Sequence, residues 1–412
     1  MDKKIKLAYI GAGARGMSVL QECFLHMTDV EIETVCDIIP KKCEAAAKLI
    51  EEKTGKRPLT TENWKEAVLC EGIDAVVFMN GWHDRIEMAC FAMEAGKYTA
   101  IEVCGAYDIS ECYKLVEVHE RTGTPLMMLE NCCYGRRELM ALRMVKEGLF
   151  GEISHCSGGY CHYLGEFFFN CAPDAESNFR LNSMAVRNCD FYPTHDLGPI
   201  SKVLNLNRGN RALRLSSFSS RAIGLKENPN CPANLKHGDI ITTIITCAGG
   251  ETIRLTLDTT LPRAFYSRDF EVRGTKGMCT ESRKVFYLKG MEENIENNEE
   301  EFFEKYDHPL QKEFQEAGAK GGHGGMDWLV CRAFIDSVKN GTRPPIDVYD
   351  AALWMSITPL SEMSISKGGA PVDIPDFTNG KWMIPNEGNK TKYSLDNIVE
   401  DKNIGVFDAF KE

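Results

Sequence analysis

Short apolar runs alternate with amphipathic stretches along the first third of the chain. Continuous apolar runs of this length predict strands that are buried on both faces, and the stretches between them have helical periodicity. Strands that alternate with helices in this way predict parallel βαβ units, with helices on both faces of one sheet. We expect strands at 5–10, 32–37, 74–80, 98–103 and 126–131, and helices at about 15–27, 43–53, 84–95 and 109–122.

After residue 131 the hydrophobic pattern changes. β-Rich or alternating segments follow one another with few helical segments between them, which predicts a mostly antiparallel sheet. The run 291–304 holds seven glutamates, and we expect a solvated loop or helix edge there. Strands are expected at 152–163, 213–221, 240–247, 252–259 and 270–273, and helices at about 136–147, 326–339 and 348–366.

A glycine-rich turn, Gly11-Ala12-Gly13-Ala14-Arg15-Gly16, follows the first expected strand and opens the first expected helix. In this context a GxGxxG pattern brings helix N-terminal N–H groups against a dinucleotide pyrophosphate, and its glycines permit the tight turn. Asp37, at the end of the next strand, would accept hydrogen bonds from the adenosine ribose hydroxyls and repel a 2′-phosphate. The pattern predicts an NAD site rather than an NADP site. A glycine turn that binds no nucleotide is the alternative.

These patterns predict an α/β fold with two domains, since 412 residues exceed what one core usually supports. Residues 1–131 would form an NAD-binding Rossmann domain with a doubly wound parallel sheet. Residues 132–375 would form an α+β domain with a large, mostly antiparallel open sheet. Residues 376–412 would be a C-terminal extension.

Charge and hydropathy disfavour several classes of partner. The net charge is −12 and the pI is near 5.4, so nucleic acid and anionic membrane surfaces would be repelled. No apolar run approaches the ~20 residues of a membrane span. The first residues lack the apolar stretch and small-residue cleavage site of a secretory signal. We expect a cytoplasmic enzyme that acts on a small molecule, without a nucleic-acid or membrane partner.

The chain holds 17 cysteines, an odd number, and most of them lie in apolar runs, as do Cys36, Cys90, Cys104, Cys247 and Cys331. Free cysteine behaves there as a small hydrophobe, which indicates a reducing compartment. No Cys-x-x-Cys pair occurs, so the spacing offers no zinc-ligand pattern and we expect no metal site.

Further short motifs stand out along the chain: Trp82-His83-Asp84-Arg85, Ala95-Gly96-Lys97, Glu102-Val103, Glu130-Asn131, Tyr192-Pro193-Thr194-His195 and Gly322-His323-Gly324-Gly325-Met326-Asp327. With the glycine turn, they make the chain from residue 5 to about 375 resemble the Gfo/Idh/MocA oxidoreductases. Within them it resembles glycoside hydrolase family 109, whose type activity is α-N-acetylgalactosaminidase. The Tyr-Pro-Thr-His and Gly-His-Gly-Gly segments are the most specific part, because the general family lacks that combination.

The resemblance also implies the residues around each ligand and a homo-oligomer, a dimer or tetramer, built through the open sheet. The NAD site would comprise Gly11, Gly13, Arg15, Gly16, Asp37, Trp82, His83, Arg85, Glu102, Val103, Asn131 and Tyr266. The carbohydrate would be contacted by Tyr160, Arg180, Tyr192, Pro193, Thr194, His195, Tyr266 and His323.

Ordinary dehydrogenases of the wider family carry Glu-Lys-Pro where this chain has Glu102-Val103-Cys104, and their lysine helps remove the alcohol proton. Valine cannot do this, and the glycosidases also have Glu-Val there. The resemblance therefore implies a redox-neutral glycosidase. NAD would oxidise C3 transiently, C2 would be deprotonated, the C1 substituent eliminated, water added and C3 reduced again. The alternatives are an NAD-dependent sugar or cyclitol dehydrogenase and a non-catalytic NAD-binding regulator.

His195 is the best candidate for the general base, because histidine titrates near neutral pH and this one precedes a helix expected near residue 197. Tyr192 and Tyr160 are candidates for proton relays or sugar contacts. Each has a structural alternative: a buried histidine bonded to backbone, tyrosines that only pack, a surface ion pair for Arg180, and a hinge in the glycine segment around His323.

Overall fold

The computed structural model describes residues 4–103, 105–165, 178–318, 321–384 and 388–399. Cys104 and parts of the expected C-terminal extension lie outside these ranges, so the expectation of a buried Cys104 is not tested. The cysteines within them form no disulfide, and most are buried. In the same ranges, no helix has the length and apolar character that a membrane crossing requires.

The N-terminal part contains a six-stranded sheet of order β3-β2-β1-β4-β5-β6, in which every neighbouring pair is parallel. This order is that of a doubly wound dinucleotide-binding fold, so the predicted Rossmann architecture is confirmed. Its strands are β1 (Ile5–Ile10), β2 (Val30–Cys36), β3 (Leu59–Thr61), β4 (Ala75–Phe78), β5 (Tyr98–Ile101) and β6 (Leu126–Met128); its helices are α1 (Ala14–Glu22), α2 (Pro40–Thr54), α3 (Trp64–Leu69), α4 (Arg85–Glu94) and α5 (Ile109–Thr122).

The C-terminal part contains an eight-stranded sheet of order β13-β12-β11-β7-β10-β9-β8-β14. Its neighbours are antiparallel except for β7 and β10, which confirms the mostly antiparallel prediction. Its strands are β7 (Ile153–Cys161), β8 (Ala212–Ser219), β9 (Ile240–Cys247), β10 (Thr252–Asp258), β11 (Glu271–Gly274), β12 (Gly277–Thr280), β13 (Val285–Leu288) and β14 (Val372–Asp373).

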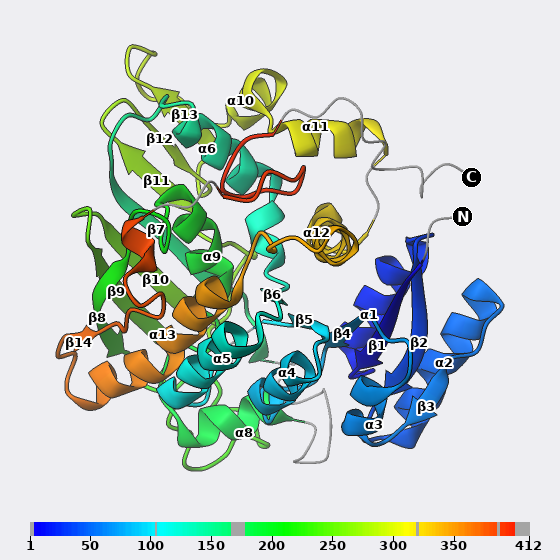
Figure 1. Cartoon of the computed structure of the whole chain (residues 1–412). Coiled ribbons are helices and arrows are strands. Elements are labelled where there is room, and N and C mark those ends of the chain that lie inside the picture. The colour runs from blue at the N-terminus through cyan, green and yellow to red at the C-terminus, as the bar shows by residue number, and fades with distance from the viewer. Residues whose placement is uncertain (1–3, 104, 166–177, 319–320, 385–387, 400–412) are drawn as a thin grey trace.

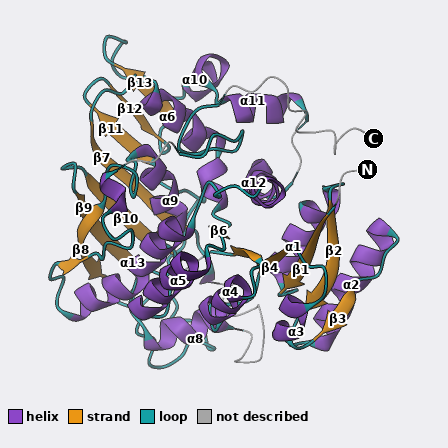
Figure 2. Cartoon of the chain, in the orientation of Figure 1, coloured by secondary structure: helices purple, strands orange, loops and turns teal. Residues whose placement is uncertain are grey.

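Helices lie between the two sheets, as Figure 1 and Figure 2 show. α9 (Thr194–Val203) packs on β7, and α13 (Val348–Ser366) packs on β8 and β14 on one side and on α5 and β6 on the other. One helix thus touches elements of both sheets. The remaining helices are α6 (Arg136–Lys146), α8 (Phe179–Val186), α10 (Glu299–Tyr306), α11 (Pro309–Glu316) and α12 (Met326–Asn340), with short 3-10 turns η1 (Phe24–His26), η2 (Asn131–Tyr134), η3 (His323–Gly325) and η4 (Lys381–Met383).

Three local predictions need correction. The first helix ends at Glu22 rather than near residue 27, and the 3-10 turn η1 follows it. The acidic run is solvated only in part: Glu299 begins α10, is 7% exposed, and accepts a hydrogen bond from Arg137 Nη2 at 3.0 Å. The helix expected near residue 197 begins at Thr194, so His195 lies in its first turn instead of before it.

Candidate functional site

The glycine turn between β1 and α1 is fixed by close backbone approaches. Gly11 has a φ of +100°, and a Cβ there would lie 2.6 Å from the backbone N of Asn80. A Cβ on Gly16 would lie 2.1 Å from the carbonyl oxygen of Gly11. At Gly13, by contrast, an added Cβ would meet nothing within 4 Å. Gly11 and Gly16 are therefore required by the fold, whereas the space beside Gly13 is open and could admit a pyrophosphate.

Asp37 follows β2 directly, and its carboxylate is held beside the glycine turn. Its Oδ2 accepts a hydrogen bond from the backbone N of Ala12 at 2.8 Å, and its Oδ1 accepts one from the backbone N of Ile39 at 2.9 Å. Both contacts leave lone pairs on the carboxylate for further donors. The side chain can therefore receive ribose hydroxyls at the edge of the sheet where dinucleotides bind.

Arg15 is engaged by a buried carboxylate for which sequence reasoning gave no role. Its Nη1 and Nη2 donate to Asp327 Oδ2 and Oδ1 at 2.6 and 2.8 Å. Asp327 is 1% exposed and also accepts from Asn131 Nδ2 at 2.7 Å and from His323 Nδ1 at 2.8 Å. Burial alone would raise the pKa of Asp327, but Arg15 and His323 hold it well below its usual range. One carboxylate thus joins the glycine turn, the end of β6 and the His323 segment.

Arg85, predicted to line the cofactor, is only 3% exposed and holds backbone together. Its Nη1 donates to the carbonyl oxygens of Glu102 at 2.5 Å and Val103 at 2.9 Å, and its Nη2 donates to the carbonyl oxygen of Asn80. The Arg85 side chain therefore connects the segment after β4 to the segment after β5 by hydrogen bonds. His83 lies nearer the surface, with its Nε2 3.1 Å from the hydroxyl of Tyr107.

The carboxyl group of Glu102 is buried beside Arg15. Burial raises its pKa even though Arg15 Nε lies 3.3 Å from Oε1 and opposes the shift. Its Oε2 has no hydrogen-bond partner among the described residues. A buried carboxyl oxygen left without a partner can receive a ligand hydroxyl. Together with the open space at Gly13 and the carboxylate of Asp37, this fits a dinucleotide along the carboxyl ends of the parallel strands.

A cluster of rings, called here the aromatic wall, is formed by Trp82, Tyr160, Phe191, Tyr192 and His195. The C-terminal sheet and α9 hold most of these side chains in place. Tyr160, at the end of β7, stacks on Tyr192 with ring centroids 4.7 Å apart, and its ring lies 5.0 Å from that of His195. Trp82 is 8% exposed and stacks on Phe191 at 5.5 Å, with an edge contact to Tyr192 at 5.6 Å. Trp82 therefore links the segment after β4 to this wall.

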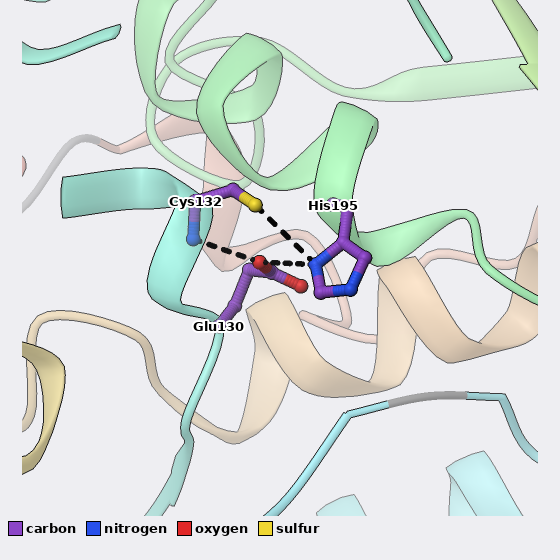
Figure 3. Close-up of side chains that lie close together, drawn as sticks. All are labelled: Glu130, Cys132 and His195. Carbon is purple, nitrogen blue, oxygen red and sulfur yellow. Dashed lines mark hydrogen bonds and ion pairs between the residues drawn. The ribbon is translucent and has the colours of Figure 1, made fainter. Parts of the chain in front are cut away.

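His195 is oriented by Glu130, as Figure 3 shows. Its Nδ1 lies 2.8 Å from Glu130 Oε1 and 3.4 Å from Cys132 Sγ. Burial alone would lower the pKa of His195, but Glu130 and Cys132 hold it well above its usual value. Glu130, which is 0% exposed, accepts the hydrogen bond from Nδ1 and stabilises the protonated ring. When the ring is neutral, its proton stays on Nδ1 and Nε2, on the opposite side of the ring, is the proton acceptor. The Glu130-Asn131 motif was recognised in the sequence, but this role of Glu130 was not.

The other predicted sugar residues fall into three groups. Arg180, in the first turn of α8, donates from Nε to the hydroxyl of Tyr192, and its guanidinium carbon lies 4.5 Å from the ring centre of Phe179. The structure thus brings Arg180 to the aromatic wall. Pro193 and Thr194 are buried, Thr194 completely, so they pack in the interior next to the aromatic wall and do not face solvent.

Tyr266 and His323 are exposed at the edge of the aromatic wall, Tyr266 by 47% of its surface. His162, which sequence reasoning missed, lies between them and the wall: its Nδ1 is 3.2 Å from the hydroxyl of Tyr160, and its ring is 5.2 Å from that of Tyr266. Burial, together with His323 and His195, lowers the pKa of His162. No motif contains His162, but its position two residues after Tyr160 on an expected strand placed both side chains on the same face.

The sequence was compared with protein families and with known proteins. Residues 134–384 match the family described as glycosyl hydrolase 109, C-terminal domain. A glycosyl hydrolase family 109 protein of Stenotrophomonas maltophilia is 36% identical over 412 residues, 92% of this chain and 90% of that protein. An alpha-N-acetylgalactosaminidase of Tannerella forsythia is 36% identical over 419 residues, 93% of this chain and 88% of that protein.

Solved structures share the fold at lower identity. A myo-inositol 2-dehydrogenase from Lactobacillus plantarum has a TM-score of 0.65 at 18% identity, over 90% of this chain and 100% of that one. A scyllo-inositol dehydrogenase from Lactobacillus casei, solved with NAD(H) and scyllo-inositol, has a TM-score of 0.65 at 15% identity, over 90% and 99%. The fold is that of the Gfo/Idh/MocA proteins, and the motif-based prediction is confirmed: the chain belongs to glycosyl hydrolase family 109.

Proposed function

We propose that the protein is an NAD-dependent, redox-neutral glycosidase that acts on α-linked N-acetylgalactosamine. The observation that carries the proposal is the His195–Glu130 pair at the aromatic wall, with Val103 at the position of the dehydrogenase lysine. A strong, oriented base next to stacked rings suits deprotonation of a bound sugar. The relatives named alpha-N-acetylgalactosaminidase support the choice of substrate.

The glycine turn would hold the pyrophosphate of NAD, Asp37 the adenosine ribose, and Glu102 and His83 the nicotinamide end. When bound, the oxidised nicotinamide supplies a hydride acceptor for C3 of the sugar and returns the hydride at the end, so that no net oxidation occurs. Asp37 makes the site selective for NAD over NADP because its charge would repel a 2′-phosphate.

The chain's own residues would manage protons and charge. A C3 carbonyl makes the neighbouring C2–H acidic, and His195 Nε2 would remove that proton while Glu130 stabilises the imidazolium. The resulting enolate expels the C1 substituent, and water then adds to the unsaturated ketone. Arg180 donates to the Tyr192 hydroxyl, which makes that hydroxyl a better proton donor to an oxygen of the sugar. Tyr160 would contact the sugar from the other ring of the stack.

The test is hydrolysis of a panel of aryl glycosides by NAD-loaded protein in D₂O. We expect release of the aryl group from the α-N-acetylgalactosaminide, deuterium at C2 of the released sugar, and no accumulation of NADH. Product without deuterium at C2 would exclude the elimination route. Stoichiometric NADH with a free sugar would identify a dehydrogenase, and NAD binding without turnover would identify a regulator.

We also propose that the protein forms a homo-oligomer through the outer face of the eight-stranded sheet. The helices α9 and α13 cover the inner face, whereas Leu213, Phe218 and Ile244 are 39%, 55% and 37% exposed. Light scattering of Phe218→Glu tests this: a smaller assembly than the wild type is expected, and an unchanged mass would exclude the face.

A further inference from the structure

Three potential metal ligands, one of them the proposed base His195, lie close together (Figure 3). Glu130 follows β6, Cys132 lies in η2, and His195 lies in the first turn of α9. The carboxylate oxygen, the thiol sulfur and the ring nitrogen all lie within 4.8 Å of one another. Glu130 and Cys132 are 0% and 2% exposed, so bulk water does not surround the cluster. Cysteine spacing could not reveal it, because His195 is 63 residues from Cys132.

The distances suit a small tetrahedral ion. Zinc bonds of about 2.0 Å to nitrogen and about 2.3 Å to sulfur place those two ligand atoms about 3.5 Å apart. Here His195 Nδ1 and Cys132 Sγ are 3.4 Å apart. Nδ1 and Glu130 Oε1 are 2.8 Å apart because a proton lies between them, and the pair would open by about 0.5 Å around an ion. Three protein ligands leave the fourth position for water.

The donor set selects the class of ion. A thiolate and an imidazole favour zinc and its thiophilic neighbours, whereas magnesium and calcium prefer oxygen ligands. Arg268 lies close to Cys132, and the positive charge of Arg268 is balanced by Glu138 at 2.8 Å. The cluster therefore presents two anionic ligands and one neutral ligand to a divalent cation.

We propose that Glu130, Cys132 and His195 form an inhibitory site for a thiophilic divalent cation such as Zn²⁺. Bonds form from the metal to Nδ1, Sγ and the carboxylate. The thiol proton leaves to solvent, and the ring loses its Nδ1 proton to solvent while Nε2 takes one proton up. A neutral imidazole carries one ring proton, so with Nδ1 on the metal that proton is on Nε2. Nε2 then has no lone pair with which to accept the C2 proton. The inhibition rests on the proposed function, whereas the binding of the ion does not.

Binding is measured with Co²⁺ added to the reduced, full-length protein, because a thiolate ligand gives cobalt a near-ultraviolet charge-transfer band. We expect one Co²⁺ per chain, displacement by Zn²⁺, and no band in Cys132→Ser. Cys133→Ser is the matched control: Cys133 is the adjacent buried thiol outside the cluster, and its loss should leave the band intact. A band that persists in Cys132→Ser, or that disappears in Cys133→Ser, overturns the site.

His195→Gln is a second variant, which should weaken Zn²⁺ binding at least tenfold even if Cys132→Ser folds poorly; unchanged affinity overturns the site. Inhibition is measured as aryl glycoside hydrolysis relative to each variant's own metal-free rate. Zn²⁺ should inhibit the wild type in step with occupancy, with recovery by a chelator, and equal Mg²⁺ should not. Full activity at full occupancy overturns the inhibitory role. If no glycoside is cleaved at all, the proposed function fails, and the cobalt spectrum still decides the site.

Discussion

The proposed dinucleotide site around the glycine turn and the aromatic wall are held together by different kinds of contact. At the proposed dinucleotide site, backbone contacts at Gly11 and Gly16 and the ion pair of half-buried Arg15 with buried Asp327 fix the geometry. At the aromatic wall, stacked rings determine the shape, and Glu130 and Cys132 raise the pKa of the proposed base His195. The difference teaches that binding and proton transfer can be disabled separately, because the residues that serve each are held by different contacts.

The largest expected effect is at the wall. His195→Gln removes the proton acceptor, and we expect aryl glycoside turnover to fall about 10³-fold, or about 4 kcal/mol in activation free energy. NAD affinity, measured by nucleotide fluorescence, should stay within about twofold because the side chain is part of the wall. Turnover within tenfold of the wild type would remove His195 from the role of base.

The next largest effect is expected at the proposed dinucleotide site, on the free energy of unfolding. Asp327→Asn takes the charge from the partner of Arg15, and we expect the free energy of unfolding in urea to fall by about 3 kcal/mol. NAD affinity should fall with it. Asp29→Asn is the matched control, because Asp29 receives a two-pronged bond from Arg332 away from the site. If both variants bind NAD like the wild type, the Asp327 network is only structural.

The next prediction concerns the pH dependence of stability at Asp190, a buried carboxyl group that supports Tyr192 of the aromatic wall. Burial raises its pKa to about 7, against a hydrogen bond from the backbone N of Tyr192. The folded state therefore binds more protons than the unfolded state between about pH 4 and 7, so stability falls as pH rises through this window. From pH 5 to 8, Asp190→Asn should gain about 2.5 kcal/mol in unfolding free energy relative to the wild type. Parallel urea curves at the two pH values would contradict the shifted pKa.

The smallest effect separates the glycines of the turn. Gly13 has ordinary extended backbone angles and open space at Cβ, so Gly13→Ala should fold normally. We expect its Kd for NAD to rise about tenfold, or about 1.4 kcal/mol, because the methyl group enters the pyrophosphate space. Gly16→Ala should instead lower Tm, since its Cβ meets Gly11. A Gly13→Ala protein with wild-type affinity would place the dinucleotide elsewhere.

Much of the fold could be predicted where the hydrophobic pattern is long and regular. The strands β1 and β9 and the helix α13 have the predicted bounds, since each has a sustained apolar pattern between clear breaks. The strands β3 and β14 were missed because two or three residues at a sheet edge carry no periodicity. The helix α11 was missed, and α10 was expected only as a loop or helix edge in the acidic run, because their packing comes from partners far along the chain, such as Arg137 against Glu299.

The site was predictable as two sets of motifs but not as an assembly. The glycine turn and Asp37 have a fixed local spacing that predicts their use. The role of Glu130 depends on His195, 65 residues away, and that of Asp327 on Arg15, 312 residues away. Arg85 has the residue type of a ligand-binding side chain, yet burial turned it to backbone carbonyls. Distances across the fold decide such roles, and local sequence does not contain them.

The packing of helix α13 limits how the two sheets can move relative to each other. The helix packs on α5 and β6 in one direction and on β8 and β14 in the other, so any swing of one sheet against the other would shear a close-packed interior. If the proposed function holds, the distance between a bound dinucleotide and the aromatic rings would therefore be fixed when the chain folds. Discrimination among sugars would then depend on Tyr266 and His323, whose exposed side chains can change conformation without disturbing the packed interior.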